Sequence, residues 1–156
     1  MSIIAIDSYE RKLDFLFSIL ENQIKHDVQL SAHWTRYLCI LVSGYLEVSI
    51  RTIYREYTRS KSSSPNIVNY VEKNLRMFRN PKMGKILELC SFFDKEWRKS
   101  MESDIDDKIK TSIDSIVNIR NEIAHGKDTG IYPSTLKEYY SDSRKFIKYL
   151  CKQCLE

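Results

Sequence analysis

The scarcity of glycine and proline is the feature that most limits what this chain can fold into. Only four glycines and three prolines occur among its 156 residues. A sandwich or barrel of many strands needs frequent tight turns, and these two residues supply many of them. Long helices need far fewer. The sequence therefore predicts an all-α protein.

Apolar residues recur with a period near 3.6 and divide the chain into a bundle of about five to six helices. Four of these helices are expected to begin near Ser8, Ser31, Ser103 and Pro133, and the third and fourth are marked by apolar residues from Ile67 and from Ile86 onward. The fourth carries a candidate break near Asp94. The second is apolar on several faces, which is typical of a helix in the middle of a bundle. No repeat or long linker interrupts the pattern, so one domain is expected over residues 1–156.

Charge and cysteine content narrow the class of protein further. The 25 basic and 21 acidic residues give a formal charge of +4, which permits a polyanionic partner without requiring one. The four cysteines lie among apolar residues, so they are predicted to be reduced core thiols of a cytoplasmic protein. The longest apolar stretch, 38–42, is too short to cross a membrane. No glycine-rich phosphate loop or metal-ligand pattern is present, so we expect no cofactor and no metal.

The fifth predicted helix carries an arginine where an apolar residue is expected. At about 100° per residue, Arg120 falls within a stripe of four isoleucines: Ile109, Ile113, Ile116 and Ile123. A guanidinium keeps its charge and is costly to bury. Arg120 therefore needs a paired acid, a subunit interface or an anionic ligand. A snorkelling side chain remains an alternative.

Two further polar residues lie one helical turn apart beside Arg120. Asn121 and His125 are four residues apart and share a face, and Gly126 marks the end of the helix. Alone, His125 would be expected to interact with the last carbonyl groups of the helix. Together, the three side chains offer a phosphate clamp, an orienting amide and a group that titrates near neutrality. Those are the parts needed to cleave a phosphate ester without a metal.

Residues 119–126 read Ile-Arg-Asn-Glu-Ile-Ala-His-Gly. This stretch resembles the Arg-polar-x-x-x-His signature of the HEPN superfamily (higher eukaryotes and prokaryotes nucleotide-binding domain). The form Arg-Asn-x-Ile-Ala-His-Gly is similar to that of its RiboL-PSP-HEPN branch. Its position at the end of a penultimate long helix agrees with the resemblance.

The resemblance implies a homodimeric, metal-independent endoribonuclease in which two copies of the motif face each other. Arg120 would then stabilise the scissile phosphate, Asn121 would orient the site, and His125 would act as general base or acid. The products would be 2′,3′-cyclic phosphate and 5′-OH ends. Many relatives are toxins of toxin–antitoxin pairs or antiphage factors, which implies an antitoxin or regulatory partner. The alternatives are a non-catalytic module that binds RNA, a nucleotide or a protein, and a plain helical dimerisation domain.

A row of basic residues supports a polyanionic partner. Arg51, Arg55 and Arg59 recur every four residues on the second predicted helix, and Tyr54 and Tyr57 lie between them as candidate base-stacking residues. The row is therefore a candidate RNA-binding surface. A solvated basic face is the alternative.

Three residues complete the predicted site. Lys127 follows the motif and is expected to bind substrate, and Glu122 lies within it as a supporting residue. Glu47 occupies the central helix, where it is expected to pair with Arg51, four residues on, or with Arg120 across the core.

Overall fold

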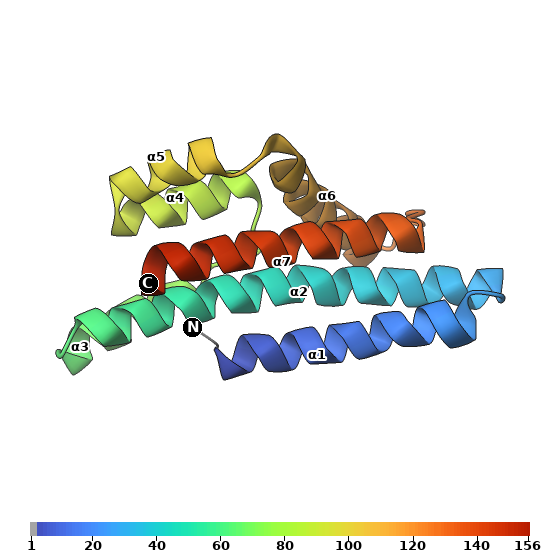
Figure 1. Ribbon diagram of the computed structural model, residues 1–156, viewed down its shortest axis with the longest axis horizontal. Helices are drawn as coiled ribbons and strands as arrows, with labels where there is room; N and C mark the ends of the chain where they lie inside the picture. Colours follow the sequence, from blue (N-terminus) through green and yellow to red (C-terminus); the bar gives the residue numbers. More distant parts are fainter. Residues whose placement is uncertain (1–2) are drawn as a thin grey trace.

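The computed structural model describes residues 3–156 and contains seven α-helices in that range (Figure 1). They are α1 (Ile4–Ile19), α2 (Val28–Lys61), α3 (Pro65–Arg76), α4 (Met83–Phe93), α5 (Lys95–Asp104), α6 (Asp107–Ala124) and α7 (Pro133–Leu155), with a short π-helix, η1 (Leu20–Ile24), after α1. No strand occurs in the described residues. The all-α prediction is confirmed. The count exceeds the predicted five to six because the fourth predicted segment divides into two helices.

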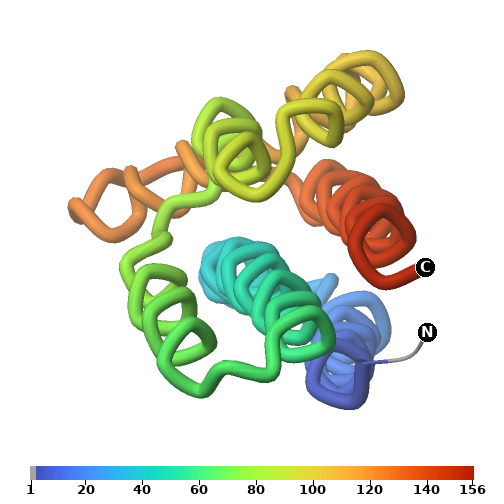
Figure 2. Tube along the Cα trace, turned by 90° about the vertical axis from the view of Figure 1, so that its left-hand side faces the viewer, coloured from blue at the N-terminus to red at the C-terminus, as the bar shows by residue number. Residues whose placement is uncertain are grey.

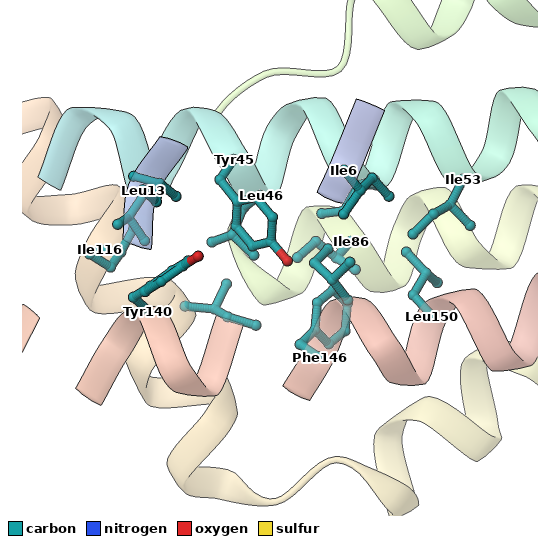
Figure 3. Packing of buried hydrophobic residues seen from close by; sticks show 14 of the residues in the cluster. Ile6, Leu13, Tyr45, Leu46, Ile53, Ile86, Ile116, Tyr140, Phe146 and Leu150 are labelled. Carbon is teal, nitrogen blue, oxygen red and sulfur yellow. The ribbon is translucent and has the colours of Figure 1, made fainter. Parts of the chain in front are cut away.

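The long helix α2 forms the centre of the bundle and packs against α1, α3, α6 and α7. It begins where the Asp27 carboxylate accepts a hydrogen bond from the Leu30 amide at 2.9 Å, an N-cap that satisfies a free helical donor. Its inward residues Leu46 and Ile53 are fully buried and face Phe146 and Leu150 of α7 (Figure 3). Burial on more than one face agrees with its apolar sequence.

Three predicted helix starts are wrong. Helix α1 begins at Ile4 instead of Ser8, α2 begins at Val28 instead of Ser31, and α6 begins at Asp107 instead of near Ser103. The difference at α6 has a local cause: the Asp94 carboxylate accepts hydrogen bonds from the amides of Glu96 and Trp97 and so starts α5. Ile105, buried between α5 and α6, then separates the two helices.

Helix α6 packs against α7 and against the first half of α2. The Cys39 thiol of α2 lies 4.0 Å from the Ile116 carbonyl oxygen of α6. The two helices meet inside the core, where burial raises the pKa of Cys39 to about 12. Cys39, Cys90 and Cys154 are buried and unbridged, which confirms their prediction as core thiols, whereas Cys151 is only half-buried. This packing places the end of α6 beside the start of α2.

Close contact between α1 and α2 shapes the neighbouring surface. The Tyr9 hydroxyl donates to the Leu41 carbonyl oxygen at 3.0 Å. A Cβ atom at Gly44 would lie 2.7 Å from the Tyr9 hydroxyl oxygen, so a side chain there would displace the Tyr9 hydroxyl from this hydrogen bond. Tyr37, Ile40 and Val48 on the outer face of α2 remain exposed. None of the helices over residues 3–156 is long and apolar enough to cross a membrane.

Candidate active site

The end of α6 is closed by a glycine in the left-handed conformation. Gly126 has φ of +73°, its amide donates to the Ile123 carbonyl, and the Lys127 amide donates to the Glu122 carbonyl, both at 3.0 Å. This pair of bonds forms a Schellman motif. His125 is therefore held at the C-cap of α6, where its backbone leaves the helix.

The loop after α6 is tied back to the rest of the molecule. The Thr129 hydroxyl donates to the Glu122 carboxylate at 2.9 Å. Arg36 of α2 forms an ion pair with Asp128 and donates to the Thr129 carbonyl oxygen at 3.5 Å. These contacts fix the backbone around His125. No sequence pattern indicated Arg36, because its partner Asp128 is 92 residues away along the chain.

Arg120 is half-buried at the end of the α6 apolar stripe, beyond the fully buried Ile113 and Ile116. Its guanidinium donates to the Asn121 side-chain oxygen at 3.2 Å. Within residues 3–156 no carboxylate pairs with it, whereas every other half-buried arginine there has one: Arg36, Arg51, Arg55 and Arg144. A partly desolvated cation without a counter-ion is a position prepared for an anion.

His125 is exposed one turn beyond Asn121. Its backbone amide donates to the Asn121 carbonyl oxygen at 3.1 Å. Its ring makes no hydrogen bond to any residue of the described chain, and both ring nitrogens remain free for a ligand. The structure therefore joins Arg120 to Asn121 directly and presents His125 beside them without a side-chain contact.

Two more residues at this end of the molecule are open to a ligand. Lys127, predicted to bind substrate, is exposed directly after Gly126. Tyr132, just before α7, is 79% exposed. An exposed ring is a surface on which a nucleobase can stack. Tyr132 was not among the predicted site residues, because a single tyrosine before a proline has no distinctive sequence signal.

The predicted basic row lies on α2 away from the motif, and each of its arginines is paired. Arg51 forms an ion pair with Glu47, Arg55 with Glu56 at 3.3 Å, and Arg59 with Glu72 at 2.6 Å. The prediction that Glu47 pairs with Arg51 is confirmed; Arg120 has no contact with it. Glu47 also accepts a hydrogen bond from the Asn80 amide at 3.3 Å.

Part of the row lines a small pocket between α2 and α3. Arg51, Arg55 and Arg76 line this pocket of about 220 Å³, and Arg59 lies outside it. Arg76 was not predicted, and within residues 3–156 it pairs with no carboxylate. Fifteen residues of helix separate Arg36 from Arg51, which places the pocket roughly 20 Å from the motif. Within one chain, the α2–α3 pocket and the motif at the end of α6 are therefore separate sites.

The predicted stacking role of Tyr54 and Tyr57 is wrong. Tyr54 is fully buried, with its ring stacked on Phe93 at a centroid distance of 4.5 Å, and burial raises its pKa. Tyr57 is half-buried and packs edge-on against Trp97 at 5.1 Å. Both rings face the core because α4 and α5 cover this side of α2, which the α2 sequence does not reveal.

The comparisons with known proteins identify one family. The family model described as RiboL-PSP-HEPN matches residues 5–156. No curated protein and no solved structure matches the chain at a significant level of similarity. The matched range includes α6 and the elements that hold its end. In residues 3–156, no group of three or more His, Cys, Asp or Glu side chains is arranged to hold a metal ion.

Proposed function

The chain belongs to the RiboL-PSP-HEPN family, and from that membership we propose that it is a metal-independent endoribonuclease with Arg120, Asn121 and His125 as its active site. Family membership alone indicates a nuclease or an RNA-binding module. The finer proposal depends on the geometry at the end of α6.

One observation carries it: Arg120 is half-buried and has no carboxylate partner in the described chain. Its only side-chain partner among residues 3–156 is the Asn121 amide oxygen, which holds the guanidinium in place without neutralising it. A planar cation of this kind binds two oxygens of a phosphodiester at once. It is suited to the extra negative charge of a pentacovalent phosphorane.

The proposed reaction assigns one role to each of these residues. The His125 ring takes the proton of the ribose 2′-OH, and the 2′-oxygen forms a bond to phosphorus. Arg120 stabilises the phosphorane, the bond from phosphorus to the 5′-oxygen breaks, and that oxygen takes up a proton from an imidazolium. The products are a 2′,3′-cyclic phosphate and a 5′-OH. In this proposal Lys127 and Tyr132 hold the adjoining nucleotides.

A homodimer supplies a second motif and therefore a second imidazole. The outer face of α2 supports this assembly, because Tyr37, Ile40 and Val48 lie on it at helical spacing and remain exposed. Arg36, which ties the motif loop to α2, lies beside that stripe. Two facing arginines would repel each other in an empty dimer, so a phosphate between them relieves the repulsion.

A role as a toxin or antiphage nuclease, restrained by an antitoxin or regulatory protein in the cytoplasm, completes the proposal. It derives from the family alone. Growth arrest on expression, relieved by His125→Ala, is the expected phenotype. Normal growth with wild-type protein that cleaves RNA in vitro would contradict this part only.

The decisive experiment is cleavage of a labelled single-stranded RNA in excess EDTA. We expect cleavage to persist, to leave 2′,3′-cyclic phosphate ends, and to fail on the matching DNA, which lacks the 2′-OH nucleophile. Loss of cleavage in EDTA, or equal cleavage of DNA, would falsify the mechanism while leaving the fold untouched.

The second candidate is a non-catalytic RNA-binding module, and the free ring of His125 favours it, since no side chain orients that imidazole in the described chain. In that case RNA would bind without being cut. His125→Ala would then leave both affinity and RNA length unchanged.

A further inference from the structure

Apolar side chains are left uncovered at the end of the molecule opposite the motif. Helix α3 packs on α2 yet buries only Leu75. Tyr70 is 71% exposed, Met77 is 80% exposed, and Phe92 of α4 is 77% exposed. A helix in a globular protein normally buries its apolar stripe against a neighbour. Here that surface has no neighbour within the described chain, which is typical of a partner-binding site.

These side chains form the walls of a groove of about 720 Å³ between α3 and α4. Figure 2 views the molecule from this end, with the 77–82 connection joining the two helices. Val71, Leu75, Leu89 and Phe93 line the groove behind the exposed residues. The Phe93 ring is stacked on the buried Tyr54, so this part of the groove is anchored in the core. The groove is therefore preformed.

The groove lies in basic surroundings. Residues 65–93 contain five basic residues and two acidic ones, and one of those acids, Glu72, is paired with Arg59. The groove lining itself holds two cations, those of Arg79 and Lys85, and one carboxylate, that of Glu88. Neither cation forms an ion pair with a described residue, although Lys85 donates to the Arg79 carbonyl oxygen at 3.3 Å. An occupant that carries carboxylates would satisfy these charges.

We propose that the α3–α4 groove binds an amphipathic segment of a partner protein, with apolar side chains at helical spacing and acidic residues on its flanks. The apolar residues fill the space between Tyr70, Met77 and Phe92, and the carboxylates meet Arg79 and Lys85. Apolar anchors in a pocket with a charged rim are the usual composition of a protein interface.

A peptide fits the groove better than RNA does. Tyr70, Phe78, Phe92 and Phe93 contribute rings to the lining, but the rest of the apolar lining is the aliphatic and thioether surface of Val71, Leu75, Met77 and Leu89. Apolar peptide side chains cover such a surface at lower cost than a charged phosphodiester backbone does. The one lining amide, that of Asn74, already donates to the Tyr70 carbonyl oxygen at 2.8 Å. Apart from the cations of Arg79 and Lys85, the lining therefore has no free side-chain amide to read a base. The groove is an apolar slot with a basic rim.

The position of the groove separates it from the motif. The motif loop contacts α2 at Arg36, whereas Tyr54 and Tyr57 mark the level of the groove. About 20 residues of helix lie between them, or about 30 Å. Helices α3 and α6 lie toward opposite ends of α2 in Figure 1. A partner segment in the groove leaves the motif of the same chain uncovered.

The test is selection of random 16-residue peptides displayed on phage against the full-length protein. The double variant Phe92→Ser/Met77→Ser serves as the counter-target. We expect enriched peptides to carry net negative charge and apolar residues at spacings of three and four. The synthesised, fluorescein-labelled peptide should lose at least tenfold in affinity against the double variant and against Arg79→Glu/Lys85→Glu.

Phe15→Ser is the matched control, because it removes an exposed aromatic ring from α1, outside the groove. It should bind the peptide as the wild type does, and all variants should retain the wild-type thermal midpoint. Enrichment of neutral or basic peptides, or equal binding by the double variant, overturns the proposal. Binding of a U12 oligonucleotide that is lost in the double variant would assign the groove to RNA instead.

Discussion

The two ends of α2 leave different kinds of groups without partners. Near its start, Arg120 and His125 present a cation and an imidazole that no described side chain neutralises or orients. Near its end, the arginines of the basic row are paired with carboxylates, while Met77 and Phe92 expose apolar surface. Among residues 3–156, the charged groups at one end have no anionic partner, and the apolar side chains at the other end have no apolar partner.

The difference between the two ends shows that charged groups without a counter-ion and apolar side chains without a packing partner indicate where different ligands bind. A half-buried charge and an exposed apolar side chain each cost free energy relative to a partnered state. Each cost is recovered by a different ligand: phosphate at the motif and an apolar, acidic peptide at the groove. Ligand chemistry can therefore be tested separately at each end.

The largest effect is expected at the motif. His125→Ala should reduce RNA cleavage by about 10²–10⁴-fold, because one positioned acid–base group contributes that much. The Arg120→Lys variant should also lose RNA cleavage, since an ammonium cannot make the bidentate contact of a guanidinium with phosphate. Initial rates on a labelled RNA measure both.

His26→Ala is the matched control for the histidine change, because His26 is exposed in the turn before α2. It should cleave at the wild-type rate. Equal loss in the two histidine variants would indicate damage to the fold instead of the site.

The next effect concerns assembly. Ile40→Glu places a carboxylate in the exposed α2 stripe, where a dimer would bury it. An unpaired buried charge costs several kcal/mol, so dimer affinity should fall by about 10²-fold or more. Light scattering should give twice the 18.5 kDa chain mass for the wild type and the single mass for the variant.

Cleavage by the Ile40→Glu variant should fall with its loss of dimer. Ile4→Glu, at an exposed position on α1, should change neither mass nor rate. A wild-type protein that is monomeric at micromolar concentration yet fully active would contradict the proposal that the motifs of two chains form one active site.

A smaller effect is expected at the basic pocket. Arg76→Gln removes the one arginine of the pocket that has no carboxylate partner in the described chain. Loss of one phosphate contact should flatten the slope of log affinity against log salt by about 0.7 for single-stranded RNA. Arg98→Gln, whose arginine is paired with Glu102 on α5, should leave the slope unchanged. Identical slopes for both variants would indicate that the pocket is a solvated surface that does not contact RNA phosphates.

The smallest effect is on stability at the end of α6. Gly126→Ala forces a side chain into φ of +73° and should cost about 1 kcal/mol. In a chain of this size, that lowers the thermal midpoint by about 2–4 °C. Gly130→Ala, where a Cβ atom meets nothing within 4 Å, is the control and should leave the midpoint within 1 °C of wild type, a margin of about 0.3 kcal/mol.

Much of the fold and part of the site follow from residues close together in the sequence. Helical periodicity, the Pro133 start and the Gly126 stop depend on contacts within four or five residues, so α6 and α7 end and begin near their predicted positions. The arrangement of Arg120, Asn121 and His125 on one turn is also local. Glu47 with Arg51 is a pairing of the same kind.

Tertiary structure determined which side chains are buried, which are paired and which remain exposed. Arg36 holds a loop 92 residues away, Tyr54 is turned into the core by Phe93, and α3 is left half-covered. None of these is encoded within one helical turn, because each depends on which distant helices pack together and at what height. Helix formation is governed by neighbouring residues, whereas burial and charge pairing are governed by the whole bundle. That is why the motif was visible in the sequence, while the unpaired state of Arg120 and the groove at the other end were not.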